Sequence, residues 1–295
     1  MDTHKTLPKV SRNRFAEVLQ NAKLVDLTLT LDEAYPCAGA WLPPFRHVVY
    51  NWYEPVPDNH PPLLSRRYTQ TARDGRTVSG VYYSNWMTIF EHTGTHFDAP
   101  THCIPPSRSG LPYANEWGDV YGDMIPLRKF QGPAAVVDAR SLRQGPQTNG
   151  ISPLITVDFL RVWEHQHGDF QRGDAVVLAT GWDEFFIPNP DGSKYLMDPW
   201  QGRTPGWPAP NAEVIEYLAD KHIELLATDA PTLGPTDDIH SVHYAGLGRG
   251  MVFVECLAHL DQLPPRGSYL LFLPPKIARS SGCFGRALAW VPPDT

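Results

Sequence analysis

The sequence predicts one α/β domain over residues 1–295, with a mixed, barrel-like β-sheet flanked by helices. Short apolar runs that are typical of buried strands recur along the chain, between segments with helical spacing of apolar residues. These strands and helices do not follow a clean βαβ period, which favours a mixed sheet. No linker rich in Pro, Gly or Ser divides the chain, and 42% hydrophobic residues suffice for a substantial core.

Each element follows from a local pattern. Apolar residues at helical spacing predict helices at 11–22, 157–167 and 211–222. In the first helix Phe15, Val18 and Leu19 share one side, and in the last Val214, Tyr217 and Leu218 do. Runs of apolar, β-branched or aromatic residues predict strands at 24–31, 47–53, 80–90, 134–139, 174–180, 223–229, 250–260 and 268–275. Between the first strands, residues 35–64 are rich in Pro and aromatics and predict an ordered loop.

Charge and composition exclude several classes of protein. The formal net charge is −7, and no Lys/Arg run exceeds the pair Arg66–Arg67, which argues against binding to nucleic acid or an anionic membrane surface. No apolar run approaches the ~18 residues that a membrane span needs, and the first residues lack the apolar core of a secretory signal. The four cysteines form no CxxC pair, so a cytoplasmic protein with free thiols is expected.

The stretch EHTGTHFDAPTHC, residues 91–103, gathers side chains that can bind metal. In a straight strand His92 and His96 would lie about 13 Å apart, too far to share one ion. Gly94 and Pro100 disfavour regular structure, so we expect a tight turn that pivots on Gly94 and lets the ligands converge. Two imidazoles and the carboxylate of Asp98 would leave coordination positions open, a set that suits Zn²⁺, Mn²⁺ or Fe²⁺.

Further candidates lie beside and downstream of this stretch. His102 follows Pro100 and is either another ligand or a general acid/base. Glu255 interrupts an apolar run, where a carboxylate is costly unless it binds metal or pairs with a cation such as Arg249. Asp229 ends a predicted strand and is either a functional acid or a turn cap. Because no GxSxG elbow and no cysteine nucleophile signature is present, a metal-activated water is the favoured nucleophile.

At this point the sequence resembles a known family. HTGTHFDAPTH, residues 92–102, resembles the HxGTHxDxPxH motif of the metal-dependent cyclase family, which includes bacterial kynurenine formamidase and isatin hydrolase. Weaker similarities follow in the family's order, at LVDLTLTL, RGDAVVLATGW, TPGW and LLATDAP, and at the pair His243 and Glu255.

The resemblance implies a swivelling β/β/α fold and a homodimer or higher homo-oligomer. It implies that His92, His96 and Asp98 hold a metal and that His102 is the catalytic acid/base. His243 and Glu255 would complete a two-metal site. The cofactor would be Zn or Mn, as one or two ions.

The expected function is hydrolysis of an amide or imide C–N bond in a small aromatic or cyclic molecule, such as an N-formyl aryl amine or isatin. Aromatic side chains near the motif suit a flat ring, and the substrate-binding candidates are Trp41, Phe45 and Trp86, with Phe90 and Trp182 nearby. Arg46 or Arg249 is a candidate partner for a substrate carboxylate. The alternatives are a lactone hydrolase, a cyclase or dehydratase on the same site, and a non-catalytic metal-binding protein.

Overall fold

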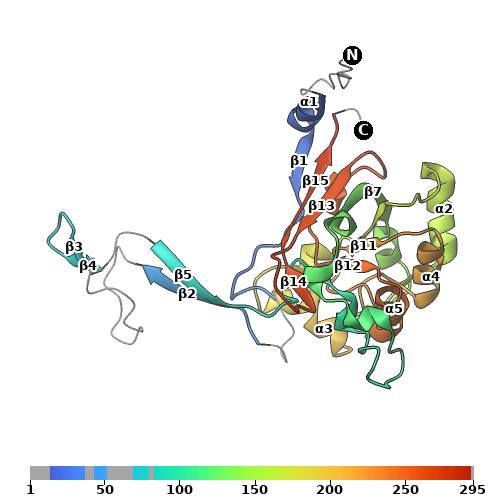
Figure 1. Ribbon diagram of the computed structural model, residues 1–295, viewed down its shortest axis with the longest axis horizontal. Helices are drawn as coiled ribbons and strands as arrows, with labels where there is room; N and C mark the ends of the chain where they lie inside the picture. Colours follow the sequence, from blue (N-terminus) through green and yellow to red (C-terminus); the bar gives the residue numbers. More distant parts are fainter. Residues whose placement is uncertain (1–13, 37–42, 52–68, 80–82, 294–295) are drawn as a thin grey trace, which may run out of the picture.

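A computed structural model describes residues 14–36, 43–51, 69–79 and 83–293. Its main feature is a nine-stranded sheet in the order β1-β15-β13-β7-β9-β11-β12-β6-β14. In chain order these strands are β1 (Lys23–Asp26), β6 (His96–Asp98), β7 (Gln131–Asp138), β9 (Ala175–Ala179), β11 (Leu225–Thr228), β12 (Val252–Glu255), β13 (Tyr269–Leu273), β14 (Gly282–Phe284) and β15 (Arg286–Val291). The expected mixed α/β architecture is confirmed, and the sheet curls into a half-barrel (Figure 1).

The centre of the sheet is parallel and buried on both faces. Strands β7, β9, β11 and β12 run parallel, and all five residues of β9 are buried. Successive β9 residues therefore enter different cores: Val177 packs with Phe97 and Phe272 on one face, and Val176 with α-helical residues on the other. Apolar runs without alternation were the sequence signal for these strands, and burial on both faces is the reason.

Helices cover one face of the sheet. These are α2 (Val157–His167), α4 (Ala212–Asp220) and α5 (Ile239–Leu247), which contribute Leu160, Leu218 and Val242 to one core. Two further helices, α1 (Arg14–Asn21) and α3 (Met197–Trp200), lie elsewhere on the body (Figure 1). Thr156 and Asn211 cap α2 and α4, each accepting a hydrogen bond from a backbone N–H of the first turn.

A two-stranded arm projects from this body. Strands β2 (Arg46–Asn51) and β5 (Tyr83–Thr88) pair antiparallel, and the short pair β3 (Thr69–Thr71) and β4 (Thr77–Ser79) lies further out (Figure 1). The remaining two-stranded sheet pairs β8 (Leu154–Ile155) with β10 (Ala209–Pro210) on the body. The two-stranded β2–β5 ribbon of the arm has no core of its own.

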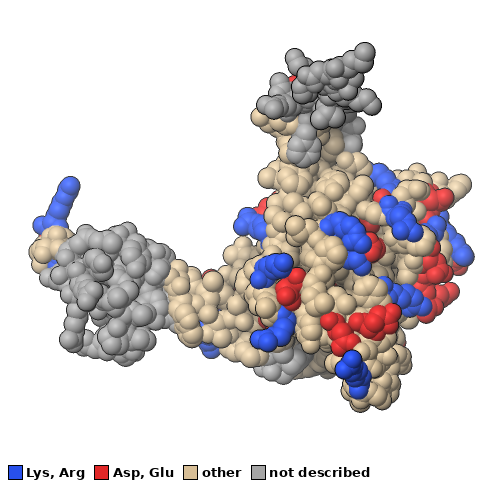
Figure 2. Space-filling model, in the orientation of Figure 1, with Lys and Arg blue, Asp and Glu red and all other residues tan. Residues whose placement is uncertain are grey.

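The predicted elements are present within the described residues. The three predicted helices correspond to α1, α2 and α4, and the eight predicted strands to β1, β2, β5, β7, β9, β11, β12 and β13. Strands β1 and β12 are shorter than predicted, because they end at Asp26 and Glu255 and not at residues 31 and 260. The sequence did not predict α3, α5, β3, β4, β6, β8, β10, β14 and β15. No helix among the described ranges is long and apolar enough to cross a membrane. On the face shown in Figure 2, Lys and Arg side chains are interspersed with Asp and Glu.

Candidate metal centre

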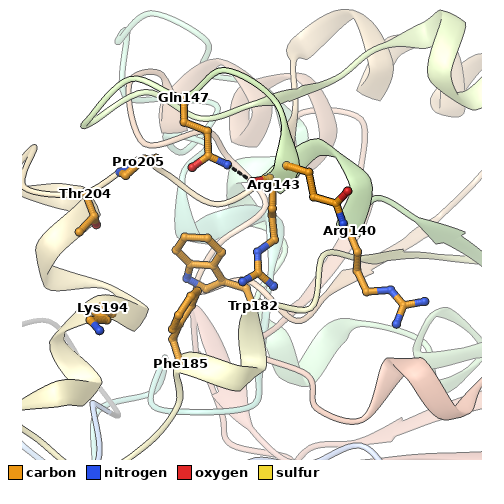
Figure 3. A pocket seen from close by; sticks show the side chains of 9 residues that line it. Arg140, Arg143, Gln147, Trp182, Phe185, Lys194, Thr204 and Pro205 are labelled. Atoms are coloured by element: carbon orange, nitrogen blue, oxygen red, sulfur yellow. Dashed lines mark hydrogen bonds between the residues drawn. The ribbon is translucent and has the colours of Figure 1, made fainter.

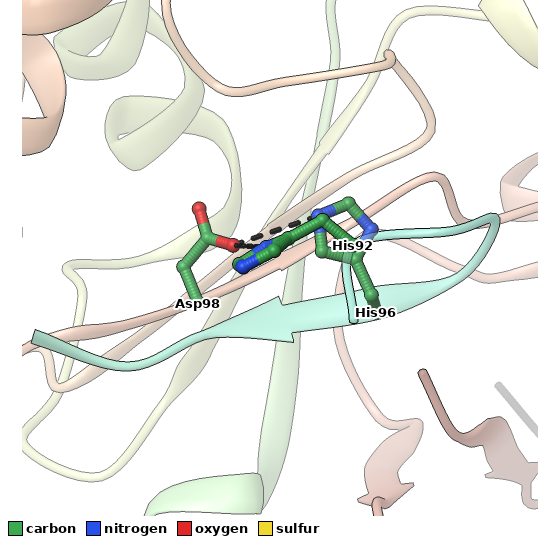
Figure 4. A group of neighbouring side chains, drawn as sticks. All are labelled: His92, His96 and Asp98. Carbon is green, nitrogen blue, oxygen red and sulfur yellow. Dashed lines mark hydrogen bonds and ion pairs between the residues drawn. The ribbon is translucent and has the colours of Figure 1, made fainter. Parts of the chain in front are cut away.

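The turn predicted at Gly94 is present. Gly94 has φ +61°, in the left-handed region, and a Cβ added there would lie 2.3 Å from Cδ2 of Leu31. The backbone conformation therefore favours glycine, and any other residue would also have to displace the Leu31 methyl group. The turn reverses the chain just before β6, so that His92 comes to lie beside the side chains of His96 and Asp98 (Figure 4).

The sheet then brings in residues that are distant in sequence. Strand β6 lies between β12 and β14, and Glu255 pairs in register with His96. Helix α5 packs on β12 and points His243 at the same place. His96, Asp98, His243 and Glu255 are all buried. Among the described residues, two groups have ligand atoms within 4.8 Å of one another: His92, His96 and Asp98, and Asp98, His243 and Glu255.

The separations between the donor atoms suit a shared cation. Nε2 of His96 lies 3.5 Å from Asp98 Oδ1 and 3.5 Å from Glu255 Oε2. Nε2 of His243 lies 3.4 Å from Asp98 Oδ2 and 3.5 Å from Glu255 Oε1. These distances are long for hydrogen bonds. They match the separation of about 3.4 Å between two ligands of a tetrahedral ion with bonds of about 2.1 Å.

Backbone carbonyls orient two of the imidazoles. Nδ1 of His96 lies 2.7 Å from the carbonyl oxygen of Gly94, and Nδ1 of His243 lies 2.8 Å from that of Ile239. A carbonyl only accepts, so each Nδ1 carries the proton. When these imidazoles are neutral, each Nε2 therefore has its lone pair directed at the carboxylates, as a metal ligand requires.

Asp98 has an unfulfilled bonding capacity that a cation would satisfy. Its Oδ2 is buried and accepts no hydrogen bond from any described residue. An unpartnered buried carboxylate oxygen is costly. Two buried carboxylates and three imidazoles are a donor set that suits a divalent ion of the zinc or manganese kind. The residues present therefore fit a metal ion.

The alternative explanation for Glu255 is wrong. Arg249 donates to the carbonyl oxygen of Ala245 and pairs with Glu216, not with Glu255. Glu255 Oε1 instead accepts hydrogen bonds from the backbone N–H of Leu233 (2.7 Å) and from Thr232 Oγ1 (3.0 Å). The other arginine proposed to meet a substrate, Arg46, pairs with Glu33.

The buried charges perturb one another strongly. Burial opposes ionisation of Asp98, but the neighbouring His102 and His92 hold its pKa well below the usual range. Burial likewise opposes protonation of His243, yet Asp98 and Glu255 raise its pKa to about 10. The two carboxylates thus demand positive charge nearby, which protons or a metal ion can supply.

His102 belongs to neither ligand group but lies beside them. It lies on the 3₁₀ turn η2 (Pro100–His102), its ring centroid 3.9 Å from that of His92 and 6.4 Å from that of His243. Burial, outweighing the attraction of Asp98, lowers the pKa of His102 to about 4. Its imidazole is therefore neutral near pH 7.

These groups form one side of a pocket of about 290 Å³, named here the imidazole–carboxylate pocket. The sequence did not single out most of its other walls. Those walls include Pro36, Phe90, Cys103, Tyr195, Leu196, Trp200, Thr232 and His240.

Two of the aromatic residues predicted to bind substrate do not line this pocket. Phe45 is buried in a core cluster with Trp182, and Trp86 is 59% exposed on the arm. Neither lines the imidazole–carboxylate pocket of this chain, whereas Phe90 does. Trp41 lies outside the described residues. Substrate contact by Trp41, Phe45 or Trp86 stays a prediction.

A larger pocket of about 570 Å³ lies apart from the metal-binding side chains. We name it the arginine pocket after Arg140 and Arg143, which line it with Trp182, Phe185 and Lys194 (Figure 3). Its chemistry is already satisfied by the chain itself. Arg140 forms two hydrogen bonds with Asp138, at 2.8 and 2.6 Å. Arg143 pairs with Glu184 and donates to the carbonyl oxygen of Gly181 at 2.7 Å.

Asp229 belongs to the wall between these pockets. Its carboxylate accepts hydrogen bonds from the backbone N–H and hydroxyl of Thr180 and from the N–H of Gly181. Its carbonyl oxygen accepts one from the hydroxyl of Tyr195. Asp229 lines neither of these two pockets, and these hydrogen bonds tie it to Thr180, Gly181 and Tyr195.

The His/Asp/Glu cluster of this curled, mixed sheet lies where β6, β12 and helix α5 meet. Other proteins share this fold. The chain belongs to the cyclase family, whose model, described as "Putative cyclase", matches residues 25–235. It is 33% identical to isatin hydrolase of Roseibium aggregatum over 216 residues, 70% of this chain and 74% of that protein. It is 29% identical to kynurenine formamidase of Salinibacter ruber over 230 residues, 77% and 89% of the two chains.

The fold comparison agrees with the family. The solved structure of isatin hydrolase A from Ralstonia solanacearum superposes with a TM-score of 0.70 at 27% identity, over 98% of this chain and 100% of that one. The family match ends before His243 and Glu255, so their place beside Asp98 is established by the fold.

Proposed function

We propose that this protein is a metal-dependent amidohydrolase that cleaves an amide-type C–N bond in a small aromatic or cyclic substrate. The candidate substrates are N-formyl aryl amines and cyclic amides such as isatin. The observation that carries the proposal is the convergence of three imidazoles and two carboxylates around Asp98, on the wall of a pocket. The names of the relatives, isatin hydrolase and kynurenine formamidase, support the reaction class.

The metal would be held by the two groups that share Asp98. His92, His96 and Asp98 form one, and His243 and Glu255 join Asp98 in the other, so there is room for one or two ions of Zn or Mn. A divalent cation bound there lowers the pKa of a water molecule and polarises a substrate carbonyl.

The chain's own residues would supply proton transfer and binding. His102 lies beside His92, lines the pocket and belongs to neither ligand group, so it is the group proposed to take a proton from the attacking water and deliver it to the leaving nitrogen. Phe90, Tyr195 and Trp200 would pack on a flat ring, since aromatic walls favour such substrates. The volume of about 290 Å³ suits a molecule of one or two rings.

Metal analysis with a substrate panel tests this function. The purified protein is assayed for bound metal, stripped with a chelator, and reloaded separately with Zn²⁺ and Mn²⁺. Each form is offered N-formylkynurenine, isatin, a cyclic imide and an aryl lactone. We expect activity on the amide substrates that is lost on chelation and restored by one ion. Hydrolysis of the lactone alone, or metal uptake without turnover of any substrate, would contradict the amidohydrolase assignment.

We also propose that the protein is a homodimer in which the arm contacts the second copy. The β2–β5 ribbon has no core of its own, and Trp86 and Met87 are 59% and 52% exposed on it. Sedimentation velocity of the wild type and of Trp86→Glu tests this. We expect a dimer for the wild type and a larger monomer fraction for the variant. A monomeric wild type would refute the proposal.

Two further proposals concern the whole chain. We propose that residues 1–295 work as one domain, because β1 and β15, from opposite ends of the chain, pair in one sheet. A cytoplasmic location is supported by the described cysteines Cys103, Cys256 and Cys283, which are all free. A single cooperative unfolding transition and recovery in the cytoplasmic fraction of the source cells are the expected results.

A further inference from the structure

His92 is held from the side opposite Asp98 by two residues that lie outside the ligand groups. Its Nε2 lies 3.1 Å from the hydroxyl of Ser281. That hydroxyl donates a hydrogen bond of 2.7 Å to Oε2 of Glu91, and the backbone N–H of Ser281 donates another of 2.9 Å to the same oxygen. Nδ1 of His92 faces Asp98 Oδ1 at 2.7 Å.

The direction of these bonds fixes where the proton of His92 lies. An ionised carboxylate only accepts, so the single hydroxyl hydrogen of Ser281 is used toward Glu91. The Ser281 oxygen can then only accept from His92, and Nε2 must carry a hydrogen. Without a metal, Nδ1 of His92 also donates to Asp98, which only accepts. When a cation replaces that proton, the hydrogen held on Nε2 by Ser281 leaves the lone pair of Nδ1 available to bind the cation.

The backbone holds Ser281 at this place. Its carbonyl oxygen accepts a hydrogen bond of 2.9 Å from the N–H of Ala99, at the end of β6. The next residue, Gly282, pairs in register with Asp98, and a Cβ there would lie 2.6 Å from Cε1 of His92. Strand β14 therefore approaches His92 as closely as a backbone can, and Ser281 contacts the ring from a fixed position.

We infer that Ser281 and Glu91 are positioning residues that orient His92 and select the tautomer able to bind metal through Nδ1. This inference rests on the proposed function, since it assigns His92 a metal. His96 and His243 are oriented by backbone carbonyls, which substitution cannot remove. His92 differs because its orientation depends on a hydroxyl and a carboxylate, and such partners typically change metal affinity by about 10- to 100-fold.

Metal affinity tests the inference separately from turnover. Dissociation constants for Zn²⁺ and Mn²⁺ are measured by competition with a chromophoric chelator, and His92→Ala identifies the ion that His92 holds. Ser281→Ala is expected to weaken the binding of that ion about 10-fold. Ser281→Thr keeps the hydroxyl and is expected to restore the affinity. Glu91→Gln keeps the shape but loses the charge, so a smaller loss is expected.

Ser280→Ala is the matched control. Ser280 is the preceding residue, and its buried hydroxyl has no hydrogen-bond partner among the described residues, so no change in affinity is expected. Melting of the metal-free proteins checks that both alanine variants fold. Wild-type affinity in Ser281→Ala would overturn the inference while leaving the proposed function intact. A wild type that takes up neither ion would overturn the proposed function itself.

Discussion

The two pockets of this protein differ in how far their charged groups are already satisfied. The arginine pocket has the larger volume, about 570 Å³ against about 290 Å³, and the more conspicuous charges. Yet Arg140 and Arg143 are paired with Asp138 and Glu184 of the same chain. In the imidazole–carboxylate pocket, Asp98 Oδ2 is buried without a hydrogen bond, and the Nε2 atoms of His96 and His243 face carboxylates. Unsatisfied donor atoms, more than volume, therefore indicate the reactive site.

Substitution of Asp98, the carboxylate that both ligand groups share, should have the largest effect on activity. Asp98→Asn removes the charge common to both ligand groups. We expect metal binding to be lost and kcat/KM to fall by at least about 10³-fold, because the cation contributes several kcal/mol. The matched change in the arginine pocket, Asp138→Asn, should leave kcat/KM within about twofold. Metal content and kinetics check both, and similar losses in the two variants would remove the distinction between the pockets.

Removal of the proton-transfer group should have the next largest effect. His102→Ala is expected to lower kcat by about 10²- to 10⁴-fold, the usual contribution of general acid/base catalysis. Metal content should stay at the wild-type level, because His102 belongs to neither ligand group. Steady-state kinetics and elemental analysis of the same sample separate the two effects. Unchanged kcat would refute the role of His102.

The wall between the pockets should respond to pH. Burial, together with the charge of Asp183, raises the pKa of Asp229 to about 7 against the hydrogen bonds from Thr180 and Gly181. Between about pH 4 and 7 the folded protein then keeps a proton that the unfolded chain releases, so this group's contribution to stability falls as pH rises. The loss is on the order of 4 kcal/mol, from a rise of about three in the pKa of Asp229.

Asp229→Asn tests that dependence, because the amide does not titrate. Urea unfolding of the wild type and the variant is compared at pH 5 and pH 8. We expect the stability of the wild type relative to the variant to be lower at pH 8 than at pH 5. A relative stability that is equal at both pH values would show that Asp229 is ionised across this range.

The arginine pocket should give the smallest effect. Arg143→Met removes a hydrogen bond to the carbonyl oxygen of Gly181 and an ion pair with Glu184. We expect a loss of about 1 kcal/mol in the free energy of unfolding and no change in kcat/KM beyond about twofold. Thermal melting and kinetics are the measurements. A large loss of activity with normal stability would show that this pocket takes part in the reaction.

The elements that the sequence predicted well are those with a strong local pattern. Residues 157–167 form α2 as predicted, since capping by Thr156 and helical spacing act within one segment. Helix α5 was missed because it is largely buried and lacks a clear polar face. Strands β6 and β14 have three residues each, too few for any periodicity to be visible.

The candidate ligands were also predictable, but their partners were not. His92, His96 and Asp98 are six residues apart at most, and Gly94 reveals the turn that gathers them. Glu255 was correctly noted as a costly carboxylate in an apolar run, yet the sequence could not exclude Arg249 as its partner. The choice of Phe45 and Trp86 as pocket residues followed proximity in sequence, which a core cluster and a projecting arm do not respect.

The sequence by itself determined which side chains are available for chemistry and where the backbone must bend around them. Both are properties of neighbouring residues, fixed by side-chain type and by the conformations that glycine and proline permit. Only the tertiary structure decided that Ser281 contacts His92 across 189 positions and that Glu255 lies beside His96. Such contacts depend on the order in which strands join the sheet, and strand order follows from the packing of the whole core.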